Sequence, residues 1–173
     1  MVYSPDRYLA ALRFAAEKHL PQKFPGTELP YLLHVVMVAS EVIAHLPALK
    51  LNDPDLAVTC AILHDTIEDT PATYDEVAAR FGAAVANGVD ALTKRDVPDK
   101  MADSLRRIRL QPREIWIVKI ADRIANMDAP PAYWSTEKKC SYREEAVPIV
   151  DAPGSATPVL DARLRARIAG YPD

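Results

Sequence analysis

The sequence is poor in cysteine and glycine and has no excess of basic residues. Its 173 residues include five glycines and two cysteines, Cys60 and Cys140. Two distant cysteines outside any C-x-x-C motif argue against a disulfide framework and against a cysteine-based zinc site. The formal net charge of −3 argues against a general nucleic-acid binder, which normally carries a strong basic excess. A local basic cluster can still bind a small anion on a globally acidic protein.

Long uninterrupted apolar runs and an N-terminal signal pattern are also missing from the sequence. No window approaches the roughly 20 apolar residues that cross a membrane, and residues 1–7 lack a basic segment followed by an apolar one. We therefore expect no membrane partner and a cytoplasmic location. With 49% hydrophobic and 26% charged residues, the chain has the composition of an ordinary globular protein with one sizeable core.

Apolar residues recur at helical spacing through most of the chain, and β-type alternation is almost absent. The pattern predicts an all-α fold, a bundle of about eight helices that forms a single domain over 1–173. The expected helices cover 5–19, 31–46, 55–69, 74–93, 99–109, 112–127, 136–149 and 158–169. Capping signals at Asp53-Pro54 and at Thr73 mark the start of the third and fourth helices. The stretch 151–158 is typical of a surface loop before the last helix.

The strongest chemical signal is the hexapeptide His64-Asp65-Thr66-Ile67-Glu68-Asp69. In a continuous helix, a rotation of about 100° per residue would place His64, Asp65, Glu68 and Asp69 on one side. The segment follows an apolar run at 56–63, so we expect these side chains to adjoin the core, where carboxylates need a partner such as a metal. An exposed acidic helix end with a chance His-Asp pair is the alternative.

Two further segments bring polar side chains into apolar surroundings. Asp122 and Asn126 lie four residues apart on one face of an otherwise apolar helix. His34 shares an apolar helical stripe in the second segment. Taken singly, Asp122 is typical of a buried ion pair with arginine, and His34 of a hydrogen-bonded core residue. Together with His64 and Asp65 they make two imidazoles and two carboxylates, a set suited to manganese, iron or zinc.

The order of these motifs resembles the HD hydrolase domain of RelA/SpoT homologues, in particular the small single-domain alarmone hydrolases. The matching phrases are HD-x-x-ED at 64–69, A-D-R-x-x-N-M at 121–127 and L-P-Y-L-L-H at 29–34. The resemblance covers 5–150. It implies a helical fold that hydrolyses the bond between a 3′-pyrophosphate and the ribose oxygen of a guanosine or adenosine polyphosphate. The length leaves no room for a synthetase or regulatory domain as well.

The resemblance also implies roles for single residues. It assigns one Mn²⁺, or another divalent transition metal, to four ligands, which are His34, His64, Asp65 and Asp122. It assigns catalysis to two acids, Glu68 and Asp69. A metal polarises a phosphoryl oxygen and lowers the pKa of a water molecule, while a nearby carboxylate orients that water or takes its proton.

Contacts to the small-molecule nucleotide polyphosphate, the partner that the resemblance implies, are less sharply defined. The candidates are Lys23, Asn126, Trp134, Lys138 and Tyr142. Basic residues between the two motif segments could neutralise phosphates, and these are Lys94, Arg95, Lys100, Arg106, Arg107 and Arg109. A solvated helix face explains each of these basic residues equally well, and helical core packing explains Trp134.

Departures from the family pattern concern specificity, and other functions stay open. Val35 stands where the family often has proline, and Met127-Asp128-Ala129 stands where many relatives have arginine and threonine. Guanine and adenine therefore both remain possible bases. Another HD enzyme, such as a nucleotidase or an NADPH phosphatase, would share the metal ligands. A nucleotide-sensing module without catalysis is a further alternative, and the oligomeric state is left open.

Overall fold

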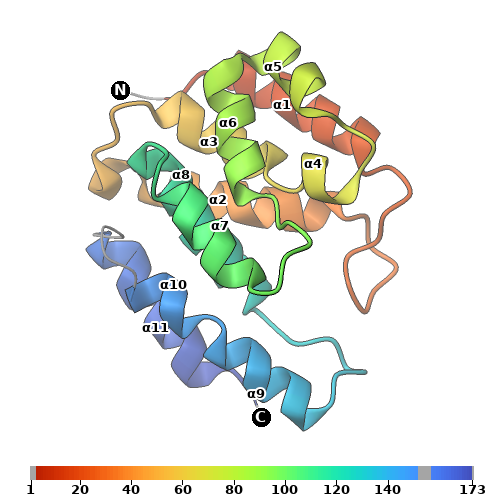
Figure 1. Cartoon of the computed structure of the whole chain (residues 1–173), viewed down its shortest axis with the longest axis vertical. Coiled ribbons are helices and arrows are strands. Elements are labelled where there is room, and N and C mark those ends of the chain that lie inside the picture. Colours follow the sequence, from red (N-terminus) through yellow and green to blue (C-terminus); the bar gives the residue numbers. More distant parts are fainter. Residues whose placement is uncertain (1–2, 152–156, 173) are drawn as a thin grey trace.

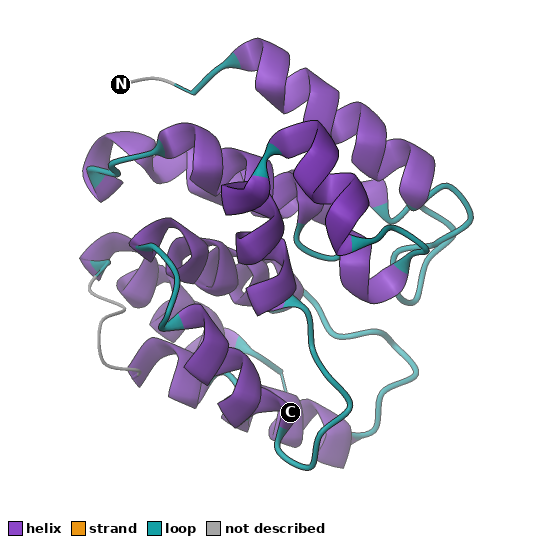
Figure 2. Ribbon diagram, turned by 45° about the horizontal axis from the view of Figure 1, so that its top comes forward, coloured by secondary structure: helices purple, strands orange, loops and turns teal. Residues whose placement is uncertain are grey.

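The computed structural model describes residues 3–151 and 157–172, and over these residues the protein is built from helices (Figures 1 and 2). The helices are α1 (Pro5–Lys18), α2 (Leu32–Leu49), α3 (Pro54–Leu63), α4 (Thr66–Asp69), α5 (Tyr74–Phe81), α6 (Ala83–Leu92), α7 (Lys100–Ile108), α8 (Arg113–Asn126), α9 (Thr136–Glu144), α10 (Val147–Asp151) and α11 (Pro158–Gly170). The prediction of an all-α fold is confirmed. Most of the loop predicted at 151–158 lies outside the described residues.

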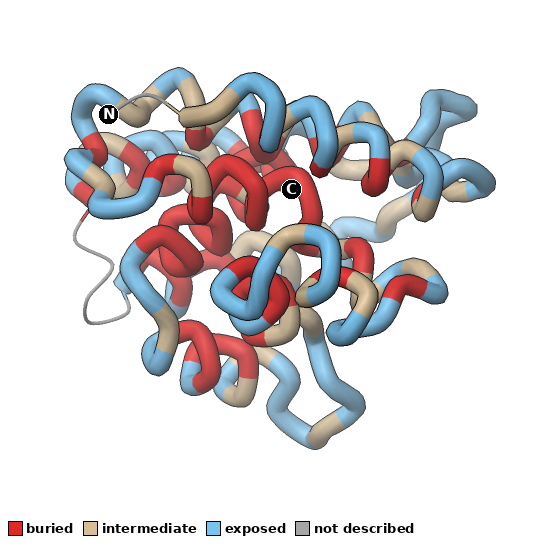
Figure 3. The backbone as a smooth tube through the Cα atoms, turned by 90° about the horizontal axis from the view of Figure 1, so that it is seen from above, coloured by how far each residue is buried: buried red, intermediate tan, exposed pale blue. Residues whose placement is uncertain are grey.

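Helix α3 forms the centre of the core. Nine of its ten residues are buried, and it packs against α1, α2, α6 and α8. Helix α8 packs against α2 and α3 and buries isoleucines over its whole length, which are Ile115, Ile117, Ile120 and Ile124. Buried residues therefore concentrate where these three helices meet (Figure 3). The C-terminal helix α11 covers the far side of α8 and also contacts α2.

The helix predicted over 55–69 is divided into α3 and α4. Side chains in the intervening turn bind backbone carbonyl groups near the end of α3: His64 Nδ1 contacts the carbonyl of Ala61 at 2.9 Å, and Thr66 Oγ1 donates to that of Leu63 at 2.7 Å. Such side-chain bonds compete with the helical pattern. The prediction that the acids of this motif share one face of a continuous helix is therefore wrong, and the turn sets their positions.

Two other predicted helices are also divided. The one over 74–93 breaks at Gly82, whose φ of +94° is a conformation that favours glycine. The one over 136–149 breaks before α10, which contains Pro148, a residue without the N–H that a continuous helix would use. The predicted caps are confirmed, because the side chains of Asp53 and Thr73 accept from the backbone N–H groups three residues on.

Helix α2 is more apolar than the sequence prediction allowed. Within the described ranges it is the one helix whose length and composition would suffice to cross a membrane, with a mean hydropathy of 1.8 over 18 residues. A single helix of this kind is weak evidence for a span, because core helices and signal sequences share these properties. In this fold α2 packs against α3 and α8 and carries the buried His34.

Candidate active site

The four predicted metal ligands come from three helices that pack on one another. His34 lies in the first turn of α2, His64 and Asp65 occupy the turn after α3, and Asp122 lies in the last half of α8. Both histidines are almost inaccessible, and the two carboxylates are 14–16% exposed. The mutual packing of α2, α3 and α8 therefore brings residues that are 88 positions apart in the sequence to one point.

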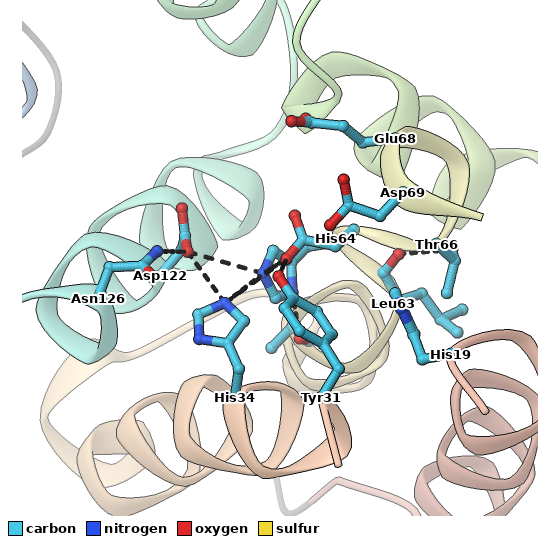
Figure 4. A network of polar contacts seen from close by, with 12 residues as sticks. His19, Tyr31, His34, Leu63, His64, Thr66, Glu68, Asp69, Asp122 and Asn126 are labelled. Carbon is cyan, nitrogen blue, oxygen red and sulfur yellow. Dashed lines mark hydrogen bonds and ion pairs between the residues drawn. The ribbon is translucent and has the colours of Figure 1, made fainter. Parts of the chain in front are cut away.

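The donor atoms of these residues converge (Figure 4). The Nε2 atoms of His34 and His64 lie 3.2 Å apart. Oδ2 of Asp65 is 2.8 Å from the His64 nitrogen and 3.5 Å from the His34 nitrogen. Oδ1 of Asp122 lies 3.4 Å and 3.7 Å from the same two atoms. Imidazole nitrogens and carboxylate oxygens at such separations could hold a divalent metal ion.

A second layer of hydrogen bonds fixes these side chains. Because Nδ1 of His64 faces the carbonyl of Ala61, its Nε2 is left to face the cluster. Tyr31 donates its hydroxyl to Oδ2 of Asp65 at 2.5 Å. The amide of Asn126 donates to Oδ1 of Asp122, also at 2.5 Å. These partners orient the donor atoms before any ligand binds.

Each charged group of the cluster shifts the pKa of its neighbours. Burial opposes ionisation of His34, but hydrogen bonds to Asp122 and Asp65 outweigh it and raise the pKa of His34 to about 9. Burial likewise opposes ionisation of Asp65, but the charge of His64 holds the pKa of this carboxyl well below its usual range. For Asp122 the charge of Lys119 and the bond to His34 have the same effect on the pKa. The imidazoles and Lys119 thus supply the positive charge that these buried carboxylates need, and a divalent cation held by the same residues would supply it instead.

Glu68 and Asp69 lie beside this cluster with partners of their own (Figure 4). Glu68 accepts from the backbone N–H of Lys94 at 2.6 Å and from its ammonium at 3.1 Å. Oδ2 of Asp69 accepts from the amide of Gln22 at 3.1 Å, and the other end of that amide contacts Nδ1 of His19 at 2.6 Å. Both oxygens of Glu68 are therefore engaged with Lys94, whereas Asp69 keeps one oxygen outside this bond.

A cleft of about 410 Å³ opens next to Asp122. Its lining includes two of the predicted substrate contacts, Asn126 and Tyr142, and two of the predicted basic residues, Lys94 and Lys100. Five further polar residues of the lining were not expected from the sequence, and these are Asp99, Ser104, Lys119, Arg123 and Glu145. The cleft thus joins the donor cluster to a set of cationic side chains.

Comparison with known proteins identifies the fold and its relatives. Residues 11–147 match the HD domain family. The chain belongs to this family. It is 32% identical to the guanosine-3′,5′-bis(diphosphate) 3′-pyrophosphohydrolase MESH1 of Xenopus tropicalis, with 90% of this chain and 89% of the relative covered. It is 35% identical to MESH1 of Homo sapiens, with 82% of each chain covered. The chain also resembles the solved structure of a metazoan SpoT orthologue that is described as hydrolysing ppGpp. The two superimpose with a TM-score of 0.81 at 23% identity, and the match covers 98% of this chain and 97% of that one. The two proteins therefore share the fold.

Other candidate residues of this HD domain lie away from the cleft lining. Lys23 donates to the carbonyl of Glu28 at 3.1 Å. Trp134 packs edge-on against Tyr142 with ring centroids 5.0 Å apart, and the ammonium of Lys138 lies 5.4 Å from the Trp134 ring. Trp134 and Lys138 thus reach the cleft only through Tyr142.

Three of the predicted basic residues have structural partners instead. Arg95 pairs with Asp90 at 2.9 Å, and Arg106 pairs with Asp103 at 2.7 Å. Arg107 binds Asp103 and also donates to the carbonyls at the end of α6, so it fixes α7 against that helix. No sequence pattern separates these arginines from the cations that line the cleft.

Proposed function

We propose that this protein is a metal-dependent 3′-pyrophosphohydrolase of an alarmone, (p)ppGpp or (pp)pApp. The observation that carries the proposal is the group formed by His34, His64 and Asp65, with Asp122 within 3.7 Å of both imidazoles, beside a cleft lined with charged residues. The names of the relatives that match nearly the whole chain support it. In the reaction, water attacks the phosphorus bound to the 3′-oxygen, that P–O bond breaks, and pyrophosphate and a nucleoside di- or triphosphate with a free 3′-hydroxyl leave.

His34, His64, Asp65 and Asp122 hold the metal in this proposal, with Mn²⁺ as the expected ion. Two nitrogen and two oxygen donors suit a borderline divalent ion better than Mg²⁺ or Ca²⁺, which prefer oxygen ligands alone. When bound, such an ion polarises a phosphoryl oxygen and lowers the pKa of water. Tyr31 supports this set by holding Asp65 in place.

Asp69 and Glu68 supply the acid–base chemistry. Gln22 holds one oxygen of Asp69, so the other can orient the attacking water or take its proton. Glu68 in turn holds Lys94 at the edge of the cleft, through both the backbone and the ammonium group. In this position Lys94 adds positive charge where the phosphates enter and stabilises the negative charge that develops there, while Glu68 holds Lys94 in place. Asn126 and Tyr142 are the proposed nucleotide contacts that line the cleft. Lys23, Trp134 and Lys138 lie outside this lining and are proposed as further contacts to the nucleotide.

The whole chain, 1–173, is proposed to act as one domain in the cytoplasm. The family match ends at 147, but α11 packs against α8 and α2 and so shares their core. Both cysteines are free, which is usual in a reducing compartment.

The cleft favours release of pyrophosphate over release of a single phosphate. Two linked phosphates need more positive charge than one, and the lining holds four cationic residues, Lys94, Lys100, Lys119 and Arg123, against three carboxylates, Asp99, Asp122 and Glu145. A phosphatase acting on NADPH would share the metal ligands and is the competing function.

A panel of substrates tests the proposal. The Mn²⁺-loaded protein is incubated with guanosine and adenosine 3′-pyrophosphates, NADPH and deoxynucleotides, each with and without chelator, and the products are separated by chromatography. We expect stoichiometric pyrophosphate from a 3′-pyrophosphorylated nucleotide and loss of this activity with chelator. Orthophosphate as the sole initial product would establish the phosphatase instead. Binding without turnover of any substrate would establish a sensing module.

A further inference from the structure

The floor of the cleft contains two buried cations with little compensation. Lys119 is 3% exposed, and its ammonium lies 3.5 Å from Oδ2 of Asp122. Arg123 is 4% exposed, and its ion pair with Glu145 spans 4.0 Å. Its guanidinium stacks on the ring of Tyr142 at 4.4 Å and donates to that residue's carbonyl at 3.4 Å. Such long contacts compensate the cost of burying two charges only in part.

Two polar atoms at this floor have no hydrogen-bond partner within the part of the chain that the structure describes. They are Oγ of Ser104 and Nε of Arg123, both buried. Buried polar groups are normally satisfied, and leaving one unpaired costs about 1–3 kcal/mol. Both residues line the cleft. The same groups would be satisfied by an oxyanion, which accepts several hydrogen bonds and carries negative charge.

The arrangement of the three side chains suits one ligand. Lys119 and Arg123 are four residues apart on α8, so they lie one turn apart on one face, with Asp122 of the donor cluster next to them. Ser104 approaches from α7, the helix that precedes α8. The other cleft lysines have carboxylate partners at normal distance, since Lys94 pairs with Glu68 and Lys100 with Asp96, both at 3.1 Å.

We propose that Ser104, Lys119 and Arg123 form a subsite that holds the pyrophosphate group of the substrate on the α7–α8 side of the metal ligands. This inference rests on the proposed function for the identity of the ligand. It assigns substrate binding to Ser104, Lys119 and Arg123, none of which is among the candidate contacts chosen from the sequence. It also gives the leaving pyrophosphate a direction, away from the Glu68–Asp69 side and towards α7.

Calorimetric titration of the protein as purified, with inorganic pyrophosphate in buffer without added metal, tests the subsite. Arg123→Gln should weaken pyrophosphate binding at least about tenfold, the scale of one charge-assisted hydrogen bond. Arg123→Lys should recover part of that loss. The control is Arg13→Gln, which removes the same charge from an exposed position on α1 and should change affinity less than about twofold.

Ser104→Ala separates binding from a structural role. The hydroxyl has no hydrogen-bond partner among residues 3–151 and 157–172, so its removal should leave the thermal midpoint unchanged or raise it. In the subsite it donates to the ligand, and pyrophosphate affinity should fall about threefold to tenfold. Unchanged affinity in Ser104→Ala and in folded Arg123→Lys, checked by circular dichroism, would overturn the inference.

The experiment also distinguishes this inference from the proposed function. If wild type cleaves 3′-pyrophosphorylated nucleotides but none of the three variants changes pyrophosphate affinity, the function stands and the subsite is wrong. If wild type cleaves none of them, yet binds pyrophosphate in a way that depends on Arg123 and Ser104, the subsite stands without the proposed reaction.

Discussion

Two parts of the site balance their charges in different ways. The donor wall is formed by His34, His64, Asp65 and Asp122, and the cleft wall is formed by Ser104, Lys119 and Arg123. On the donor wall, each member of the His34–His64 pair faces Asp65 and Asp122 within 3.7 Å. On the cleft wall, the buried Arg123 lies 4.0 Å from its carboxylate partner and leaves Nε unpaired. A cation site needs several carboxylates close to the bound ion. Buried cations with few carboxylate partners are instead suited to bind an anion. The difference fits the proposal that a metal ion binds at the donor wall and phosphate groups at the cleft wall, although Asp122 and the two cations lie side by side on α8.

The largest effect is expected on metal binding when one of the four proposed ligands is removed. His64→Ala removes a ligand, so the remaining donors cannot close around the ion and metal affinity should fall at least about 100-fold. Elemental analysis of the purified protein measures this directly. His45→Ala is the matched control, because His45 lies on the same helix as His34 but contacts the backbone carbonyl of Glu41. Equal metal content in wild type and His64→Ala would contradict the assignment.

Replacing Glu68 and Asp69 should slow hydrolysis strongly and leave the metal ion bound. Asp69→Asn and Glu68→Gln keep size and hydrogen bonding but remove the negative charge, so turnover should fall by about 10²-fold, the scale of general acid–base catalysis. Single-turnover rates on metal-loaded variants provide the measurement, with metal content as the control. Near wild-type rates in both would mean that neither carboxylate acts on the water.

A smaller effect is expected from the layer behind the donor wall. Tyr31→Phe removes the hydroxyl that donates to Asp65 and should weaken metal binding about tenfold, as losses of such supporting bonds do. Tyr74→Phe removes a hydroxyl that donates to Asn87, away from the site, and serves as the control. Metal titrations of the two variants compare their affinities for the ion. Identical affinities would show that Asp65 keeps its position without Tyr31.

The donor wall could be predicted from the sequence far better than its local geometry. Histidine and aspartate inside apolar segments pointed to buried ligands, and the structure brings all four side chains together. The break after α3 could not be predicted, because it depends on the side chains of His64 and Thr66 binding backbone carbonyls. Sequence spacing describes helical propensity, and it does not register this competition.

The burial and the role of the cleft-wall residues could not be predicted from the sequence. Lys119 and Arg123 have the spacing of ordinary helix charges, and only the packing of α8 against its neighbours shows that they are buried. Arg107 shows the opposite error, because it lies in the predicted phosphate cluster but caps the end of α6. Charge at a position says little about its role until the acceptors around it are known.

The division between the two walls is tested most directly by measuring bound metal and the KM for a 3′-pyrophosphorylated nucleotide on the same preparations of two variants. We predict that Arg123→Gln keeps one metal ion per chain while its KM rises at least about tenfold. His64→Ala should lose the ion. If Arg123→Gln lost its metal as His64→Ala does, or kept a wild-type KM, the two walls would not have separate roles and the account would be contradicted.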